Sequence, residues 1–234
     1  MSLREALADV ARFLARPRFM PEPKPLGRVT AKGLLAAELV HLGLLMVVVA
    51  PLWLAGRNAG AFPAPRIDGD RLAASPLAFL VIAPLLEELL FRGWLTGRVA
   101  ALRFAAFGFA AMALMLAGVG LVPDHGRLLG YVDAGVALAG LVHWSLTRAR
   151  DRSVPPVFIR HFAPIVWASA LLFGLIHLGN YHALASPFGL AVVLPQVLGG
   201  LLLAYIRTHH GLGAAMAYHA GYNALVLAGF SAGW

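Results

Sequence analysis

The chain consists of apolar runs of about twenty residues separated by short polar connections, and this pattern constrains its fold more than any other feature. A helix needs about 20 apolar residues to cross the hydrocarbon core of a bilayer. Only 13% of the residues are charged, whereas a soluble domain carries about a quarter. The pattern predicts an all-α fold, a polytopic transmembrane helical bundle of about seven spans. The expected spans are 33–55, 73–98, 100–121, 128–148, 162–180, 187–207 and 212–232.

The formal net charge of +8 is carried by the connections rather than by one face of a helix. Connections rich and poor in arginine and lysine alternate, as cytoplasmic and external loops do in membrane proteins. We therefore predict an integral protein of the bacterial cytoplasmic membrane, with its N-terminus inside, the lipid bilayer as a partner and no nucleic-acid partner. The chain has no cysteine, which excludes disulfides, thiolate nucleophiles and thiolate metal sites.

The sequence divides into a basic segment, 1–32, and an integral membrane domain, 33–234. The first segment begins with "MSLREALADVARFLARPRFM", in which apolar residues recur at helical spacing. This pattern predicts a short amphipathic helix on the membrane surface, and a partly disordered basic tail is the alternative. The proline-rich linker "PEPKPLG" ends any such helix. The apolar face of the predicted helix is formed by Leu3, Leu7, Val10 and Leu14.

Polar side chains inside the spans are functional candidates, because ionisable groups are costly in hydrocarbon. They lie in the stretches "APLLEELLFRGWL", "LLFGLIHLGN" and "AYHAGYNAL", in the helices of about 73–98, 162–180 and 212–232. The simplest alternative is that they only hydrogen-bond one helix to another, and this is the interpretation we adopt for His143 and for Glu38 with His41. Asp133 lies near a span end, where it reaches water. The candidates are Glu87, Glu88, Arg92, His177, His219 and Asn223.

The spacing of the two glutamates separates their expected roles. Glu88 and Arg92 are four residues apart, so they share a helix face and form an ion pair. Glu87 lies about 100° around the helix from Glu88, so it projects elsewhere and requires partners from other helices. His219 and Asn223 also lie four residues apart. The whole set, placed on three apolar helices, exceeds what helix packing requires.

These motifs resemble those of the CPBP intramembrane proteases, the type II CAAX prenyl endopeptidase and bacteriocin-processing family, which includes proteins like the lysostaphin-resistance proteins. The family has a Glu-Glu-x-x-x-Arg helix, a Phe-x-x-x-His helix and a His-x-x-x-Asn helix, in that order. The chain carries "EELLFR", "FGLIH" and "HAGYN" in the same order. The resemblance covers roughly 77–98 and 165–227. About ninety residues separate the first two motifs, more than the family pattern suggests, so 100–148 is expected to be an inserted hairpin.

The resemblance implies an intramembrane endopeptidase acting on a membrane-associated or prenylated-type protein or peptide. Its first glutamate corresponds to Glu87, which would activate the water molecule as a general base. His177, His219 and Asn223 would then stabilise the oxyanion, or one histidine would protonate the leaving amine. The supporting residues would be Glu88, Arg92 and Phe173.

Two further questions stay open at the level of sequence. Glu87, His177 and His219 form a set of two histidines and a carboxylate, like some catalytic zinc sites, so a divalent metal such as zinc is an alternative cofactor. We favour metal-free chemistry, because asparagine is a poor zinc ligand. A non-catalytic immunity or scaffold protein, or a transporter using the buried charges, is the alternative function. The identity of the substrate, the side from which the site opens and the oligomeric state are also left open.

Overall fold

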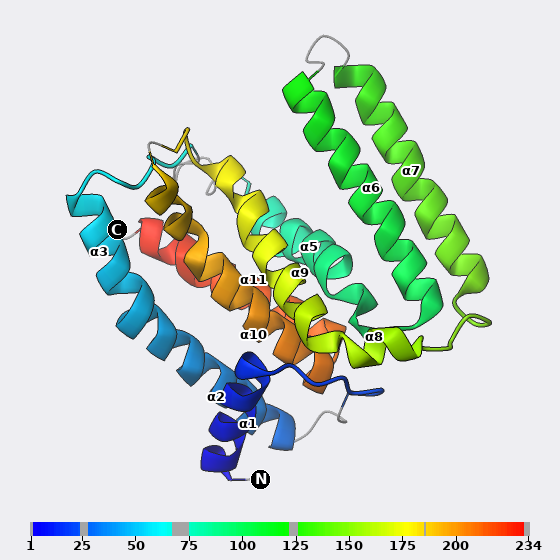
Figure 1. Ribbon diagram of the computed structural model, residues 1–234, viewed down its shortest axis with the longest axis horizontal. Coiled ribbons are helices and arrows are strands. Elements are labelled where there is room, and N and C mark those ends of the chain that lie inside the picture. The colour runs from blue at the N-terminus through cyan, green and yellow to red at the C-terminus, as the bar shows by residue number, and fades with distance from the viewer. Residues whose placement is uncertain (1, 24–27, 67–74, 122–125, 185, 232–234) are drawn as a thin grey trace. The chain divides into compact units, whose positions relative to one another are not determined.

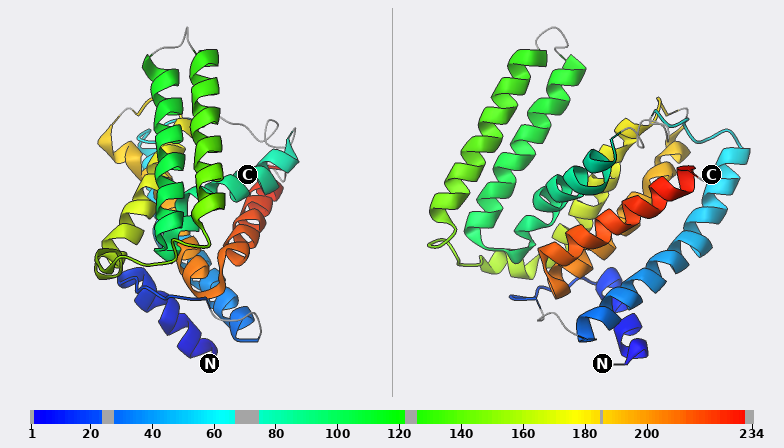
Figure 2. Two further views of the ribbon diagram at one scale, coloured as in Figure 1. Left: turned by 90° about the vertical axis from the view of Figure 1, so that its right-hand side faces the viewer. Right: turned by 180° about the vertical axis from the view of Figure 1, so that it is seen from behind.

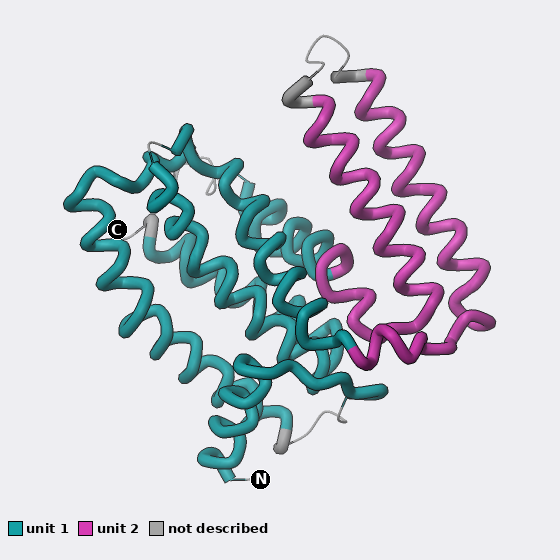
Figure 3. Tube along the Cα trace, viewed as in Figure 1, with its two compact units in different colours: residues 1–88, 161–234 teal, residues 89–160 magenta. Residues whose placement is uncertain are grey.

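The computed structural model describes residues 2–23, 28–66, 75–121, 126–184 and 186–231, and these residues form an all-helical fold without strands, as predicted. Within them, five helices are long and apolar enough to cross a membrane. The predicted count of seven spans stays a prediction. The chain divides into two compact units, one of residues 1–88 and 161–234 and one of residues 89–160 (Figure 3).

The first unit contains the second and third predicted motifs and the two glutamates of the first motif, and α10 lies at its centre (Figure 1). Helix α10 packs against α9, α11, α2 and α1, and 56% of the most apolar stretch in Pro187–His210 is buried. The elements of this unit are α1 (Leu3–Ala15), α2 (Arg28–Leu44), η1 (Leu45–Val49), α3 (Ala50–Asn58), η2 (Ala78–Ile82), α5 (Ala83–Phe91, through Glu88), α9 (Phe162–Ile176), η5 (His177–Asn180), η6 (Pro187–Val193), α10 (Leu194–His210) and α11 (Leu212–Ser231).

Two helices of this unit contain a π-helical turn that ends two residues before a proline. The segment η1 precedes Pro51, and η2 precedes Pro84. Proline has no backbone N–H, so it cannot make the usual bond to the carbonyl four residues earlier. A π turn widens the helix by one residue at such a point, and π turns are frequent at functional sites. The α2–η1–α3 helix is continuous over Thr30–Asn58, longer than the predicted span of 33–55.

The N-terminal helix α1 packs on α2 and α10. Its buried residues are Ala6, Val10 and Phe13, and the Phe13 ring lies edge-on to Tyr205 of α10 at 5.5 Å between centroids. The Tyr205 hydroxyl donates a 3.4 Å hydrogen bond to Asp9. A helix therefore forms in the predicted segment, while its position on a membrane surface stays a prediction. Residues 24–27 of the predicted proline-rich linker lie outside the described residues.

The second unit holds a long antiparallel hairpin of two apolar helices, which run side by side in both views of Figure 2. The two helices meet through Phe104 with Trp144 and Phe107 with His143, each pair 5.8 Å apart between ring centroids. A Cβ atom at Gly140 would lie 2.6 Å from Cβ of Phe107, so only glycine allows this close approach. The elements are η3 (Gly93–Thr96), α6 (Val99–Leu121), α7 (Gly126–Thr147) and α8 (Pro156–Arg160).

The helix of the first motif is shorter than its apolar run suggests. The predicted span of 73–98 has its α-helical end at Phe91, and Arg92 and the 3₁₀ turn η3 follow. A helix that ends directly after "EELLF" places the two glutamates in its last turns rather than in its middle. The hairpin α6–α7 covers the predicted insertion of 100–148, and its origin as an insertion stays a prediction.

Candidate active site

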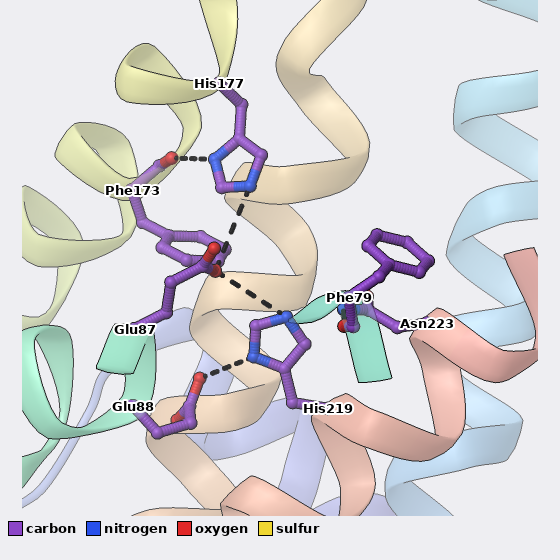
Figure 4. A network of polar contacts seen from close by, with 7 residues as sticks. All are labelled: Phe79, Glu87, Glu88, Phe173, His177, His219 and Asn223. Carbon is purple, nitrogen blue, oxygen red and sulfur yellow. Dashed lines mark hydrogen bonds and ion pairs between the residues drawn. The ribbon is translucent and has the colours of Figure 1, made fainter. Parts of the chain in front are cut away.

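The predicted site residues of the first unit come from three separate helices. Glu87 and Glu88 lie in α5, His177 is the first residue of η5, directly after α9, and His219 lies in α11. Figure 4 shows these side chains pointing toward one another. The helices are far apart in sequence, so the site exists only because they pack into one bundle.

Both histidines direct their Nε2 atoms at the same oxygen of Glu87. Nε2 of His219 lies 3.7 Å from Oε2 of Glu87, and Nε2 of His177 lies 4.0 Å from the same atom. These distances are too long for direct hydrogen bonds. Oε2 of Glu87 is buried and has no hydrogen-bond partner within the described part of the chain. The three atoms therefore surround a point where a hydrogen-bond donor is required.

The orientation of each imidazole is fixed through its other nitrogen. Nδ1 of His219 lies 3.0 Å from Oε1 of Glu88, and Nδ1 of His177 lies 2.7 Å from the carbonyl oxygen of Phe173. A carboxylate and a carbonyl can only accept, so both Nδ1 atoms carry the proton. In the neutral imidazoles, both Nε2 atoms are then hydrogen-bond acceptors aimed at Glu87.

The contact between Glu88 and His219 was not predicted. The sequence predicted that Arg92, four residues along the helix, neutralises Glu88. The structure places Glu88, which is completely buried, against His219 of another helix. Arg92 is also buried, at 1% exposure, directly after the end of α5. Its ion pair with Glu88 stays a prediction.

Phe173 packs between the two histidines. Its ring centroid lies 4.7 Å from that of His177 and 6.0 Å from that of His219, edge-on in both cases. Its side chain is 3% exposed. The phenylalanine of the second motif thus holds the imidazoles apart and excludes water from one side of them, and its own carbonyl sets the tautomer of His177.

Asn223 makes a different contact from the one expected. Its Nδ2 donates a 2.9 Å hydrogen bond to the carbonyl oxygen of Phe79, in η2. In this π turn the N–H of Ala83 bonds the carbonyl of Ala78, five residues earlier. The next donor in this register would come from Pro84, which has none. Asn223 therefore satisfies a carbonyl that the proline leaves open, and it joins α11 to the helix of the first motif.

These side chains line a cavity of about 440 Å³ inside the first unit. Its walls come from α2, α3, η2, α5, α9, η5, α10 and α11, and most of its lining is apolar. Glu87, His177, His219 and Asn223 all face it. The Glu87 side chain is 27% exposed as a whole, although its Oε2 atom is buried, and the imidazole of His219 is nearly buried.

A second polar group on the cavity wall was not predicted as part of a site. His41, interpreted from sequence as a link between helices, is 2% exposed and stacks on the ring of Tyr222 at 4.9 Å. Its Nδ1 lies 3.1 Å from the hydroxyl of Tyr218. The sequence contained a signal for this contact. Tyr218 and Tyr222 are four residues apart, so they share one face of their helix, and they stand one position before His219 and Asn223.

Binding of a metal ion, the alternative raised by the sequence, requires ligands arranged around one point. Glu87, His177 and His219 supply atoms of the types that zinc binds. Among the described residues, however, no group of three histidines, aspartates or glutamates is placed to hold a metal ion. The side chains present do not fit a metal site, so we derive no catalytic step through a metal.

The family of the chain follows from comparison with known proteins. No curated protein and no solved structure matches the chain. The family model described as "Type II CAAX prenyl endopeptidase Rce1-like" matches residues 70–164 and 160–225, which together make up more than half of the chain. The match includes all three motifs that contribute to the cavity. Five helices in the described part of the chain are long and apolar enough to cross a membrane, so the chain is an integral membrane protein, and it belongs to the type II CAAX prenyl endopeptidase Rce1-like family.

Proposed function

We propose that the protein is an intramembrane endopeptidase that hydrolyses a peptide bond of a membrane-associated or prenylated protein or peptide, with water activated by Glu87. The observation that carries the proposal is the convergence of two imidazole Nε2 atoms on one oxygen of Glu87 inside a largely apolar cavity. This oxygen has no hydrogen-bond partner among the residues that the structure describes. A water molecule there can donate one hydrogen to Glu87 and the other to an imidazole. Its oxygen is then oriented for attack.

The first step is the attack of water on the substrate carbonyl carbon. Glu87 takes a proton from the water as the new C–O bond forms, and the carbonyl oxygen becomes an oxyanion. General-base catalysis of this kind contributes about 10²- to 10⁴-fold to a rate. Asn223 donates one N–H to Phe79, and its second N–H supplies a donor for the oxyanion.

The second step is the departure of the amine. The proton taken by Glu87 passes to Nε2 of His219, 3.7 Å away, while Glu88 at Nδ1 balances the positive charge of the imidazolium. His219 then donates this proton to the leaving nitrogen as the C–N bond breaks. The products are a carboxylic acid and an amine, and transfer of the proton to the amine returns Glu87 and His219 to their starting protonation states.

The test is cleavage of an internally quenched, farnesylated peptide that ends in a CAAX sequence. The wild-type protein, purified into nanodiscs, should cleave the peptide, and mass spectrometry should show two fragments whose masses sum to the peptide plus one water. The Glu87→Gln variant should bind the peptide without cleaving it. No cleavage of this peptide, together with no membrane protein accumulating uncut in Glu87→Ala cells, would contradict the proposal.

The N-terminus-inside orientation and the bacterial cytoplasmic membrane remain part of this proposal. They are supported by the alternation of charged connections along the sequence. Cysteine-scanning accessibility from each side of inverted and right-side-out vesicles measures the orientation directly, since the natural chain has no cysteine.

A further inference from the structure

The cavity wall formed by α2, α10 and α11 carries polar atoms that the proposed reaction does not use. His41 of α2 and Gln196 of α10 both line the cavity that contains Glu87. Nε2 of His41 and Oε1 of Gln196 are buried, and neither has a hydrogen-bond partner within the described part of the chain. A buried polar atom without a partner is costly, so two of them in one cavity indicate a ligand.

The contacts of His41 determine what its Nε2 can bind. Nδ1 of His41 lies 3.1 Å from the hydroxyl oxygen of Tyr218, and we assign this hydrogen bond as donated by Nδ1. With its proton on Nδ1, the neutral imidazole presents Nε2 as an acceptor. Stacking on Tyr222 at 4.9 Å holds the ring in this orientation.

Gln196 also presents an acceptor. Its side chain lines the cavity, and its buried Oε1 has no hydrogen-bond partner among the described residues. An amide oxygen can only accept, so this atom is available to a hydrogen-bond donor of a ligand.

Gly199 keeps the space before His41 open. It lies three residues after Gln196, so both are on one face of α10, and both line the cavity. A Cβ atom at Gly199 would lie 3.9 Å from Nε2 of His41. This is an ordinary van der Waals distance, so a methyl group would fit there and would cover the acceptor.

We propose that His41 Nε2 and Gln196 Oε1 form a positioning subsite that accepts hydrogen bonds from backbone N–H groups of an extended substrate peptide. The proposal rests on the proposed function, because it places the same substrate in the same cavity. A peptide suits the subsite because an extended chain presents backbone N–H groups on one edge at regular intervals. A lipid chain offers no donor, so it would leave both acceptors unsatisfied.

The experiment measures peptide binding separately from cleavage. The probe is the farnesylated CAAX peptide with a fluorescent label, and its Kd is measured by anisotropy with Glu87→Gln protein in nanodiscs. In that background we compare His41→Phe, which keeps the stacked ring but loses the acceptor, with His41→Gln, which restores an acceptor near the position of Nε2. Gln196→Met and Gly199→Ala are measured alongside. Loss of one hydrogen bond should weaken binding about tenfold.

A set of peptides identifies the donor. Each backbone amide is N-methylated in turn, so that one N–H is lost at a time. N-methylation at one position should weaken binding about tenfold when the protein has His41. The same methylation should have no further effect on the His41→Phe protein, because the two changes remove the same hydrogen bond. In the otherwise wild-type enzyme, His41→Phe should raise KM with little change in kcat. His41→Gln should have a KM closer to the wild-type value than His41→Phe has.

The outcomes separate this proposal from the proposed function. Unchanged Kd in His41→Phe and Gly199→Ala, or additive effects at every N-methylated position, would overturn the subsite. Equal loss of binding in His41→Phe and His41→Gln would also overturn it, because it would indicate packing rather than an acceptor. A different result would uphold the subsite and contradict the proposed protease activity. In that result, the effects of His41→Phe and of one N-methylated position on Kd are coupled, but the wild-type protein cleaves no peptide.

Discussion

The two units of this protein are both made of apolar helices, yet they use polar residues very differently. In the first unit, acids, imidazoles and an amide from separate helices meet in a cavity. In the second, the α6–α7 hairpin is held by aromatic contacts and a close glycine. The most apolar stretch of α7 is only 6% buried, against 56% for that of α10. Most of α7 is thus available to lipid, whereas α10 is enclosed by protein.

This difference shows how function can be located in a membrane protein. Composition alone does not distinguish the units, because both contain buried polar atoms, including Oδ1 of Asp133 and Nδ1 of His143 in α7. The units differ in whether polar side chains from separate helices meet at one point. In the first unit two imidazoles lie next to Glu87, and further hydrogen-bond acceptors fix the orientation of each imidazole.

The largest difference between the units is expected when one carboxylate in each is replaced by its amide. Glu87→Gln should lower kcat at least about 1000-fold, because it removes the general base while preserving shape. Asp133→Asn is the matched change in the hairpin, and it should leave kcat within about twofold. Cleavage of the farnesylated peptide measures both, and elution from size exclusion checks folding. Similar losses in the two variants would remove the distinction between the units.

A smaller effect is expected from Glu88→Gln. The amide can donate to Nδ1 of His219 and so favour the wrong tautomer, which turns Nε2 away from its role as an acceptor. Removal of such an orienting partner costs about 10- to 100-fold. We expect the loss in kcat with little change in KM, and a shifted pH profile, measured with the same peptide. A Glu88→Gln enzyme with wild-type kcat and pH profile would show that the contact is only structural.

Aromatic truncation should have a smaller effect on activity. Phe173→Ala removes the ring packed against both imidazoles, so it should lower kcat about tenfold and also lower the unfolding temperature, because it opens a cavity in the core. Phe107→Ala removes a comparable ring from the α6–α7 interface and should lower only the unfolding temperature. Thermal unfolding and peptide cleavage are measured on the same samples. Loss of kcat in Phe107→Ala would tie the hairpin to the reaction.

Much of this arrangement could be predicted from the sequence. Apolar run length gave most of the helices, and the spacing of polar residues indicated that Glu87 must find partners on other helices. The contact of Glu88 with His219 could not be predicted, because the i and i+4 spacing rule describes neighbours on one helix and says nothing about a histidine 131 residues away. The role of Asn223 depends on a π turn, which arises from Pro84 and from the packing of α11.

The end of the first motif helix and the tyrosine contacts of His41 were missed for related reasons. An apolar run continues past Phe91, so hydropathy does not mark where the helix ends. A lone histidine in an apolar helix is usually a packing residue, and only the structure brings Tyr218 and Tyr222 onto its ring. In both cases the structure depends on tertiary contacts, which the local sequence pattern does not reveal.

The most direct test of the central claim is turnover of the same protein before and after removal of metal ions. If Glu87 acts on water directly, protein depleted of metal with a chelator, and checked by elemental analysis, should cleave the farnesylated peptide at an unchanged rate. Activity that falls in step with bound metal, and returns when zinc is added back, would contradict the account. It would make Glu87, His177 and His219 metal ligands rather than a general base and its partners.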